Sequence, residues 1–359
     1  MARILFFCIN GVGLGHAARI LALARQVRKR APDSEILVIT SSENSHIFSR
    51  EGIPSVKVPS PTSKGWDRRL PVAELAHALT AQTVAIFRPH LAVVDSMPAG
   101  LFGEYLSPLM IVPKRVFIFG RFPDHYSNSH YKTSLKQYGR ILVPYIENER
   151  DQIGVKFGDD ARWVGDILVR SKNEILARED ARRRIRVNPE ELVIYVGLGG
   201  GGNPQNDEIL TWLLDCLSNY PQIKIACAVQ PLAKGHDIIF KHANCVPVNH
   251  FPMSEYFSAF DIAVSAAGAN SAELIYAGVP AIFIPLGYPS TDQEFNANRF
   301  SKIGLGHNVA PMDTKSFTDA VDDLLVEKNR ENMSAKMLDW AGPNGAEIAA
   351  DEIVSYLES

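Results

Sequence analysis

The sequence lacks the features that mark membrane-spanning, redox-active and nucleic-acid-binding proteins. No apolar run reaches the roughly 20 residues that a helix needs to span a bilayer. The four cysteines form no CxxC pair, and three of them, Cys8, Cys227 and Cys245, lie in or beside apolar strand-like runs. We therefore expect reduced core cysteines and a cytoplasmic setting. The net charge of −3 gives no electrostatic reason to expect nucleic acid as the main ligand.

Repeats at solenoid period and low-complexity tracts are also missing. What remains is a chain of 359 residues, of which 46% are hydrophobic and 21% charged. That balance is typical of a globular protein, and the length exceeds what one hydrophobic core usually serves. Two domains are therefore expected.

Short apolar runs alternate with helical patterns along the chain. Helical spacing is seen at 17–29, 74–87 and 207–217. The runs predicted as buried strands are 4–9, 36–40, 56–58, 91–94, 116–119 and 141–144 in the first half, and 192–196, 223–229, 245–248, 262–265 and 281–285 in the second. This alternation predicts an α/β fold of two Rossmann-like, doubly wound parallel-sheet domains.

The domain boundaries follow from where the strand–helix cycle restarts. We place a first domain at 1–164, a second domain at 165–340, and a C-terminal helix at 341–359 that packs back on the first domain. The seam between two such domains is where a ligand is expected.

The first motif with chemical content runs from Asn10 to His16, directly after the first strand and at the start of a helix. Its Gly13-x-Gly15-x-x-Ala18 spacing lets backbone approach a phosphate, as in a dinucleotide fingerprint. A dehydrogenase would also need an acidic residue at the end of strand two, and only Glu43 is near. His16 instead places a titratable ring at the helix N-terminus, where its neutral form is favoured, and this suits a general base.

The second motif, Gly197-Leu-Gly-Gly-Gly-Gly-Asn203, repeats this layout in the second half. Glycine costs conformational entropy and brings no packing, so four in a row predict a phosphate cradle, with a flexible turn as the alternative.

The third motif is an ordered set of small and polar residues. Small residues from Ser265 to Ser271 open a helix and offer N–H groups to phosphate, and Glu273, one turn on, can accept both ribose hydroxyls. Asp292, Gln293 and Asn296 carry donors and acceptors suited to sugar hydroxyls.

In this combination the sequence resembles the GT-B glycosyltransferases, particularly the MurG-like N-acetylglucosaminyltransferases and the wider UDP-glycosyltransferases. The resemblance implies a GT-B fold, His16 as general base, and a UDP-sugar donor. It also implies that the domain at 1–164 binds the acceptor and that the domain at 165–340 binds the nucleotide sugar. It implies base contacts just before the Met-x-x-Tyr/Phe segment, at Phe251 and Met253. The donor-binding residues are then Gly13, Gly15, Gly199, Gly200, Gly201, Gly202, Asn203, Phe251, Met253, Ala267, Gly268, Ala269, Asn270, Ser271, Glu273, Asp292, Gln293 and Asn296.

Two features depart from the MurG pattern. The first loop reads Asn-Gly-Val-Gly-Leu-Gly-His-x-x-Arg in place of Gly-Gly-x-Gly-Gly-His, and this form also resembles a UDP-sugar hydrolase of the pseudaminic acid pathway. The Asp292-Gln293 order is closer to the wider UDP-glycosyltransferases. Specificity for a lipid-linked intermediate is therefore not carried over.

The mechanism expected from these residues is inverting displacement at the anomeric carbon. His16 deprotonates an acceptor hydroxyl or amine, and Asp95 orients the imidazole, with a turn cap as its alternative role. The acceptor should meet 59–70 and 121–131, where Trp66 and His125 are candidate contacts. No Asp-x-Asp motif occurs, so we expect neither a metal nor a cofactor.

Alternative functions remain open on the same residues. A UDP-sugar hydrolase or epimerase would use the same scaffold, and an NAD-dependent oxidoreductase would use the Gly13 loop. The expected partners are a nucleotide sugar and an acceptor (small molecule, glycan or lipid-linked). Peripheral membrane contact is left open.

The five arginines within 178–186 predict a solvated helix face, with membrane or acceptor attraction as the alternative.

Overall fold

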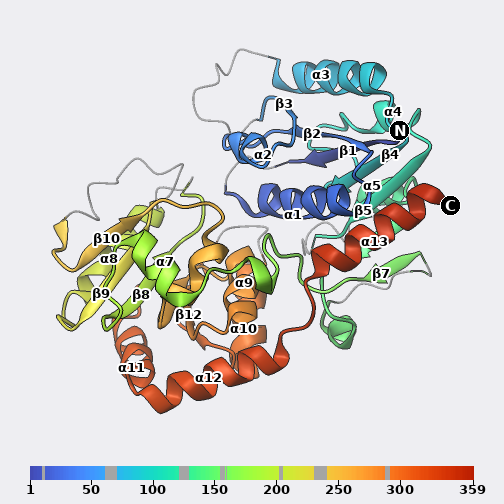
Figure 1. Cartoon of the computed structure of the whole chain (residues 1–359). Coiled ribbons are helices and arrows are strands. Elements are labelled where there is room, and N and C mark those ends of the chain that lie inside the picture. Colours follow the sequence, from blue (N-terminus) through green and yellow to red (C-terminus); the bar gives the residue numbers. More distant parts are fainter. Residues whose placement is uncertain are drawn as a thin grey trace. The chain divides into compact units, whose positions relative to one another are not determined.

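The chain divides into two compact units, each built around one parallel sheet (Figure 1). The computed structural model describes residues 1–9, 13–60, 71–120, 129–153, 158, 160–201, 205–229, 241–287 and 292–359. Unit 1 comprises Met1–Val169 together with Pro343–Ser359, and unit 2 comprises Arg170–Gly342. The predicted fold class, two Rossmann-like parallel-sheet domains, is confirmed.

The sheet of unit 1 has seven strands in the order β3-β2-β1-β4-β5-β6-β7, and every neighbouring pair is parallel. Its strands are β1 (Arg3–Cys8), β2 (Glu35–Thr40), β3 (Ser55–Lys57), β4 (Leu91–Asp95), β5 (Lys114–Ile118), β6 (Arg140–Val143) and β7 (Ala161–Trp163). The central strand β1 is apolar throughout Ile4–Cys8 because helices cover both faces of the sheet. The strand order reverses between β1 and β4.

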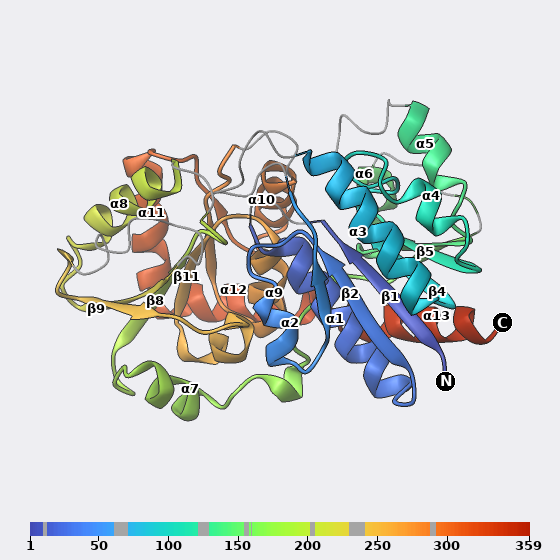
Figure 2. The ribbon, with the colours of Figure 1, turned by 90° about the horizontal axis from the view of Figure 1, so that it is seen from above.

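Because crossovers between parallel strands are right-handed, the reversal of strand order places the helices of unit 1 on both faces of its sheet. The helices are α1 (Gly15–Arg30), α2 (His46–Arg50), α3 (Val72–Phe87), α4 (Leu106–Leu109), α5 (Ser129–Leu135), α6 (Arg150–Ile153) and α13 (Gly345–Glu358). Helix α13 packs against α1 and touches β5, while α3 lies on the other face beside α4 (Figures 1 and 2). Both chain ends therefore belong to unit 1.

The sheet of unit 2 has six strands in the order β10-β9-β8-β11-β12-β13, again all parallel. Its strands are β8 (Leu192–Gly197), β9 (Ile223–Ala228), β10 (Cys245–Val248), β11 (Ile262–Ser265), β12 (Ala281–Phe283) and β13 (His307–Asn308). Along β8, Ile194 and Val196 enter one core, while Val193 and Tyr195 enter the core on the opposite face. This period of two is the pleat of a strand that is buried on both sides.

Each face of this sheet is covered by its own helices. Side chains of α8 and α11 fill the core with Ile194, and those of α7, α9, α10 and α12 fill the other. The helices are α7 (Arg178–Ile185), α8 (Gln205–Leu217), α9 (Ala269–Ala277), α10 (Gln293–Lys302), α11 (Thr314–Leu325) and α12 (Glu327–Trp340), with 3₁₀ segments at Lys172–Glu174 and Met253–Ala259, and at Glu147–Glu149 in unit 1.

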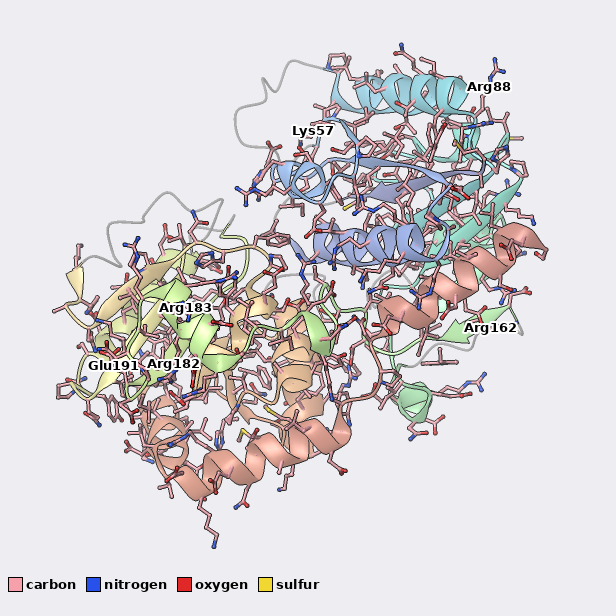
Figure 3. All side chains as sticks on the ribbon, in the orientation of Figure 1. Lys57, Arg88, Arg162, Arg182, Arg183 and Glu191 are labelled. Atoms are coloured by element: carbon pink, nitrogen blue, oxygen red, sulfur yellow. The ribbon has the colours of Figure 1, made fainter. Side chains whose placement is uncertain are left out.

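One arginine of the basic run at 178–186 contradicts the prediction of a uniformly solvated face. Arg182 is only 1% exposed, and it donates to the carbonyls of Ala259 and Glu191 and to the carboxylate of Asp261. Figure 3 shows it on α7 next to the exposed Arg183. A buried guanidinium needs hydrogen-bonding partners, and those of Arg182 lie outside α7. Arg182 therefore holds α7 against the rest of unit 2.

Candidate functional site

In unit 1, the candidate site is built where β1 ends and α1 begins. Gly13 has a φ of +98°, which a glycine adopts without strain, and Gly15 is the first residue of α1. The N-cap residue, Leu14, makes no side-chain cap bond, and the first turn contains no acidic residue. The first N–H groups of α1 therefore lie at the end of the helix that also carries His16.

His16 lies against Asp95, the last residue of β4. The imidazole Nδ1 is 3.0 Å from Asp95 Oδ2. The contact follows from the sheet order, because β1 and β4 are neighbours and Cys8 pairs with Asp95 in register. The carboxyl ends of both strands thus meet at the reversal point, where open α/β sheets bind ligands. The Asp95 side chain is fully buried, and that of His16 is 31% exposed.

Two further residues, for which no role was predicted, complete this group. Arg19 follows His16 by three residues, so both lie on one face of α1. Its Nη2 lies 2.8 Å from Asp95 Oδ1 and 2.8 Å from Ser96 Oγ, and its Nε lies 3.2 Å from Asp95 Oδ2. The Ser96 hydroxyl donates to Asp95 Oδ1 at 2.6 Å.

Ser96 holds an unusual backbone conformation directly after β4. Its φ is +66°, in the left-handed region that residues with a Cβ rarely adopt. Its N–H donates to the Ile118 carbonyl of the neighbouring strand at 2.9 Å, which ties this turn to the sheet. Backbone strain of this kind is found most often at functional sites, where it helps to fix the direction of a side chain.

Electrostatics keep the Asp95 carboxylate ionised. Burial by itself acts to raise its pKa, but the charges of Arg19 and His16 and the hydrogen bonds from His16 and Ser96 outweigh burial and lower the pKa to about 2. The site therefore holds a permanent buried carboxylate between a guanidinium and an imidazole.

In unit 2, the glycine loop follows β8. Gly199 and Gly201 have φ values of +80° and +79°, so the backbone of this loop requires glycine there. Gly200 lies between them. Gly202 and Asn203 lie outside the described residues, and α8 begins at Gln205.

The loop between β11 and α9 is held by hydrogen bonds to its backbone. The Asn296 carboxamide donates to the Ala267 carbonyl at 3.1 Å, and the Ser271 hydroxyl donates to the Gly268 carbonyl at 2.6 Å. Gly268 is the N-cap of α9 and makes no side-chain cap bond. The N–H groups at Ala269 and Asn270 belong to the first turn, where a helix has no partners of its own for them.

The other predicted donor residues follow the same edge of the sheet. Glu273, buried to 9% exposure, lies one turn into α9, and Asp292 is the N-cap of α10. The Gln293 carboxamide oxygen accepts the Leu286 N–H at 2.8 Å, just after β12. Phe251 and Met253 follow β10, each half-buried. These segments come after β8, β10, β11 and β12, whose carboxyl ends share one edge because the strands are parallel.

The predicted acceptor residues, Trp66 and His125, lie outside the described residues.

Comparisons with known proteins assign the chain to a class. Residues 215–351 match the family model for the glycosyltransferase family 28 C-terminal domain. The UDP-N-acetylglucosamine–N-acetylmuramyl-(pentapeptide) pyrophosphoryl-undecaprenol N-acetylglucosamine transferase of Acetivibrio thermocellus is 26% identical, over 96% of this chain and 96% of that relative. The transferase of the same name from Clostridioides difficile is 23% identical over 98% of this chain and 88% of the relative.

Solved structures share the fold. The crystal structure of Acinetobacter baumannii MurG superposes with a TM-score of 0.64 at 15% identity and covers 98% of this chain and 99% of that one. The calicheamicin glycosyltransferase CalG4 gives a TM-score of 0.67 at 15% identity, over 100% of this chain and 98% of that one.

The fold and the comparisons together identify the chain as a glycosyltransferase of the GT-B fold. Within that class it is MurG-like.

Proposed function

We propose that the protein transfers N-acetylglucosamine from UDP-N-acetylglucosamine to an acceptor hydroxyl, with inversion at the anomeric carbon and His16 as general base. The observation that carries this proposal is the contact of His16 with the buried, ionised Asp95 at the N-terminus of α1. A carboxylate behind an imidazole holds the ring in one orientation and stabilises the imidazolium that forms. The donor is taken from the names of the relatives, which are UDP-N-acetylglucosamine transferases.

Unit 2 supplies the groups that a nucleotide diphosphate sugar needs. N–H groups at the start of α9 and in the loop at Gly199–Gly201 can meet the diphosphate. In this proposal Glu273 would accept the ribose hydroxyls. Backbone near Phe251 and Met253 would meet the base, and Asp292 and Gln293 the sugar. Helix N-termini and loop N–H groups can stabilise the charge that grows on the leaving diphosphate, so the proposal needs no metal.

The reaction balances with the groups named. The acceptor oxygen forms a bond to the anomeric carbon as its proton passes to His16. The bond from that carbon to the diphosphate oxygen breaks, and UDP leaves with the electron pair. Attack from the face opposite the leaving group inverts the anomeric centre.

The surface of unit 1 favours an acceptor presented at a membrane. Large apolar side chains are exposed on and around α3 and α4, which pack against each other, and Met110, Ile86 and Ile111 are the most exposed at 77%, 72% and 67%. We call the exposed residues of this region the apolar patch: Ile86, Leu101, Phe102, Leu106, Met110 and Ile111. The exposed Arg88 follows α3 directly (Figure 3). No helix among the described residues has the length and apolar character to cross a bilayer.

We propose that the apolar patch rests on an anionic bilayer, because apolar area together with basic residues gives peripheral binding. Co-sedimentation with phosphatidylglycerol vesicles tests it. Ile86→Ser/Met110→Ser should weaken co-sedimentation several-fold, and Leu338→Ser, an exposed leucine of unit 2, is the matched control. Equal binding by all three proteins would contradict this contact.

The experiment that tests the proposed activity follows UDP release and sugar transfer from UDP-N-acetylglucosamine, with and without an undecaprenyl-pyrophosphoryl-muramyl acceptor. The proposal expects transfer that depends on acceptor. Sugar release at the same rate without acceptor would show a hydrolase, and conversion of the sugar at carbon 2 an epimerase. Binding of NADH without binding of UDP would contradict the whole assignment.

A further inference from the structure

Tyr195 on β8 brings a hydroxyl group to the edge of the sheet where the nucleotide is proposed to bind. We infer that Tyr195 is a donor-binding residue: its hydroxyl donates a hydrogen bond to one ribose hydroxyl of the sugar nucleotide, and that ribose hydroxyl donates in turn to Glu273. This role rests on the proposed function, in which Glu273 meets the ribose. It adds a residue that makes this part of the site specific for ribonucleotides.

The ring of Tyr195 is fixed in the apolar core of unit 2. Its centroid lies 5.0 Å from that of Phe260, in a stacked arrangement, and 5.7 Å from that of Phe257. The residue is only 2% exposed, and it belongs to the core on the face of the sheet that α9 covers. A phenylalanine ring would have the same size and shape, so packing accounts for the ring of Tyr195 but not for its hydroxyl.

Gly197 shows in which direction the hydroxyl points. Gly197 is the last residue of β8 and follows Tyr195 by two residues, so both face the same side of the strand. A Cβ atom on Gly197 would collide with the Tyr195 hydroxyl oxygen and with the ring carbon that carries it. The side chain of Tyr195 therefore runs along β8 towards the carboxyl end of the strand, and its hydroxyl occupies space that only a glycine leaves open.

Glu273 is the acidic residue that acts on this hydroxyl. Gly197 is paired with Ser265, the last residue of β11, and α9, which carries Glu273, follows β11. Burial is the main cause that raises the pKa of Tyr195, and Cys227 and the carboxylate of Glu273 raise it further. The phenol therefore keeps its proton at neutral pH and can act as a hydrogen-bond donor.

The place beside the Tyr195 hydroxyl suits a ribose hydroxyl. Although Glu273 and Tyr195 interact electrostatically, the Tyr195 hydroxyl makes no hydrogen bond to any residue that the structure describes. Such a hydroxyl costs free energy among apolar side chains until it finds a partner. A ribose hydroxyl can accept from Tyr195 while it donates to Glu273. A phosphate group only accepts, and the negative charge of Glu273 would repel it.

Affinities for UDP, 2′-deoxy-UDP and 3′-deoxy-UDP, measured by isothermal titration calorimetry with the full chain, test this role. Tyr195→Phe removes only the hydroxyl, so it should bind UDP about two- to tenfold more weakly than the wild type, as expected for one neutral hydrogen bond. The analogue that lacks the bridging hydroxyl should bind equally well to both proteins, because the group that Tyr195 contacts is gone. The other analogue should show the same loss as UDP.

Tyr220→Phe is the matched control, because it removes the hydroxyl of another tyrosine of unit 2, one that donates to Asp322. It should leave all three affinities unchanged. Equal UDP affinity in Tyr195→Phe and the wild type, or an equal loss with UDP and both analogues, would overturn the inference. A lower Tm of ligand-free Tyr195→Phe at unchanged UDP affinity would assign the hydroxyl to the fold instead.

Failure of the proposed function looks different. If the wild type binds no UDP, the donor assignment is wrong, and the role of Tyr195 is wrong with it. If the wild type binds UDP and transfers the sugar while Tyr195→Phe binds UDP equally tightly, the proposed function stands and only the role of Tyr195 is wrong.

Discussion

In both units a short loop that contains glycine connects a parallel strand to a helix, but the side chains around the two loops differ. In unit 1, the loop after β1 leads to His16, which is surrounded by charged and polar side chains: Asp95, Arg19 and Ser96. In unit 2, the loop before α9 consists of small residues whose backbone is held by Ser271 and Asn296. We propose that the same local architecture serves proton transfer in unit 1, where side chains converge on the loop, and anion binding in unit 2, where backbone N–H groups would meet the ligand.

The largest effect is expected at the side-chain site of unit 1. His16→Ala should reduce turnover by about 10²–10⁴, because the general base is lost. His307→Ala, which also removes a histidine paired with a carboxylate (Asp323), should leave turnover unchanged. Initial rates of UDP release at saturating donor measure both. Normal turnover in His16→Ala would show that unit 1 does not supply the base through His16.

The next effect is expected in unit 2. Glu273→Ala removes the carboxylate proposed for the ribose, and a hydrogen bond to a charged group contributes about 1.5–3 kcal/mol, or roughly 10- to 150-fold. The KM for UDP-N-acetylglucosamine should rise by that order with little change in kcat. Glu331→Ala on α12, an exposed position, is the control. A drop in kcat with unchanged KM would assign Glu273 to the chemistry instead.

A smaller effect is expected from the loop that precedes α9. Asn296→Ala leaves the Ala267 carbonyl without its carboxamide partner, so the loop should be less well positioned. The KM for the donor should rise several-fold, and Asn298→Ala, on the same helix and bonded to Glu294, should change it less. Equal KM values in the two variants would show that the loop does not depend on Asn296.

The smallest effect concerns acid stability in unit 1. The pKa of Asp95 is lowered in the folded protein from 3.8 to about 2, so its ionised form stabilises the fold. This contribution is fully present above about pH 4 and is lost as the pH falls through about 2. The difference in Tm between wild type and Asp95→Asn should therefore shrink as the pH is lowered over that interval. A constant difference would mean that Asp95 does not titrate there.

Sequence patterns predicted the sheets because their strands are buried on both faces and are therefore apolar throughout. They missed β7 and β13, which are short and only half-buried. His16 and Asp95 could be placed together because Asp95 ends β4 and His16 lies just after β1, and the carboxyl ends of these strands share one sheet edge. Arg19 belongs to the His-x-x-Arg pattern of the first loop. It contacts the carboxylate of Asp95, 76 residues away along the chain, and a local pattern does not predict such a contact.

The left-handed conformation of Ser96 could not be predicted from the sequence, because serine has no special preference for it. The polar residues of the Asp-Gln-x-x-Asn pattern were predicted to meet a sugar. In the structure the side chains of Asn296 and Gln293 form hydrogen bonds with the backbone of Ala267 and Leu286, which precede α10, and composition does not reveal such partners. Local patterns thus predicted which segments form the site, while the network within it came from the tertiary fold.

The most direct test of the account is the affinity for UDP, measured by isothermal titration calorimetry in the wild type, His16→Ala and Glu273→Ala. If nucleotide binding belongs to unit 2 and proton transfer to unit 1, His16→Ala should bind UDP within about twofold of the wild type, and Glu273→Ala should bind at least about tenfold more weakly. Equal loss of UDP binding in both variants, or no binding by the wild type, would contradict it.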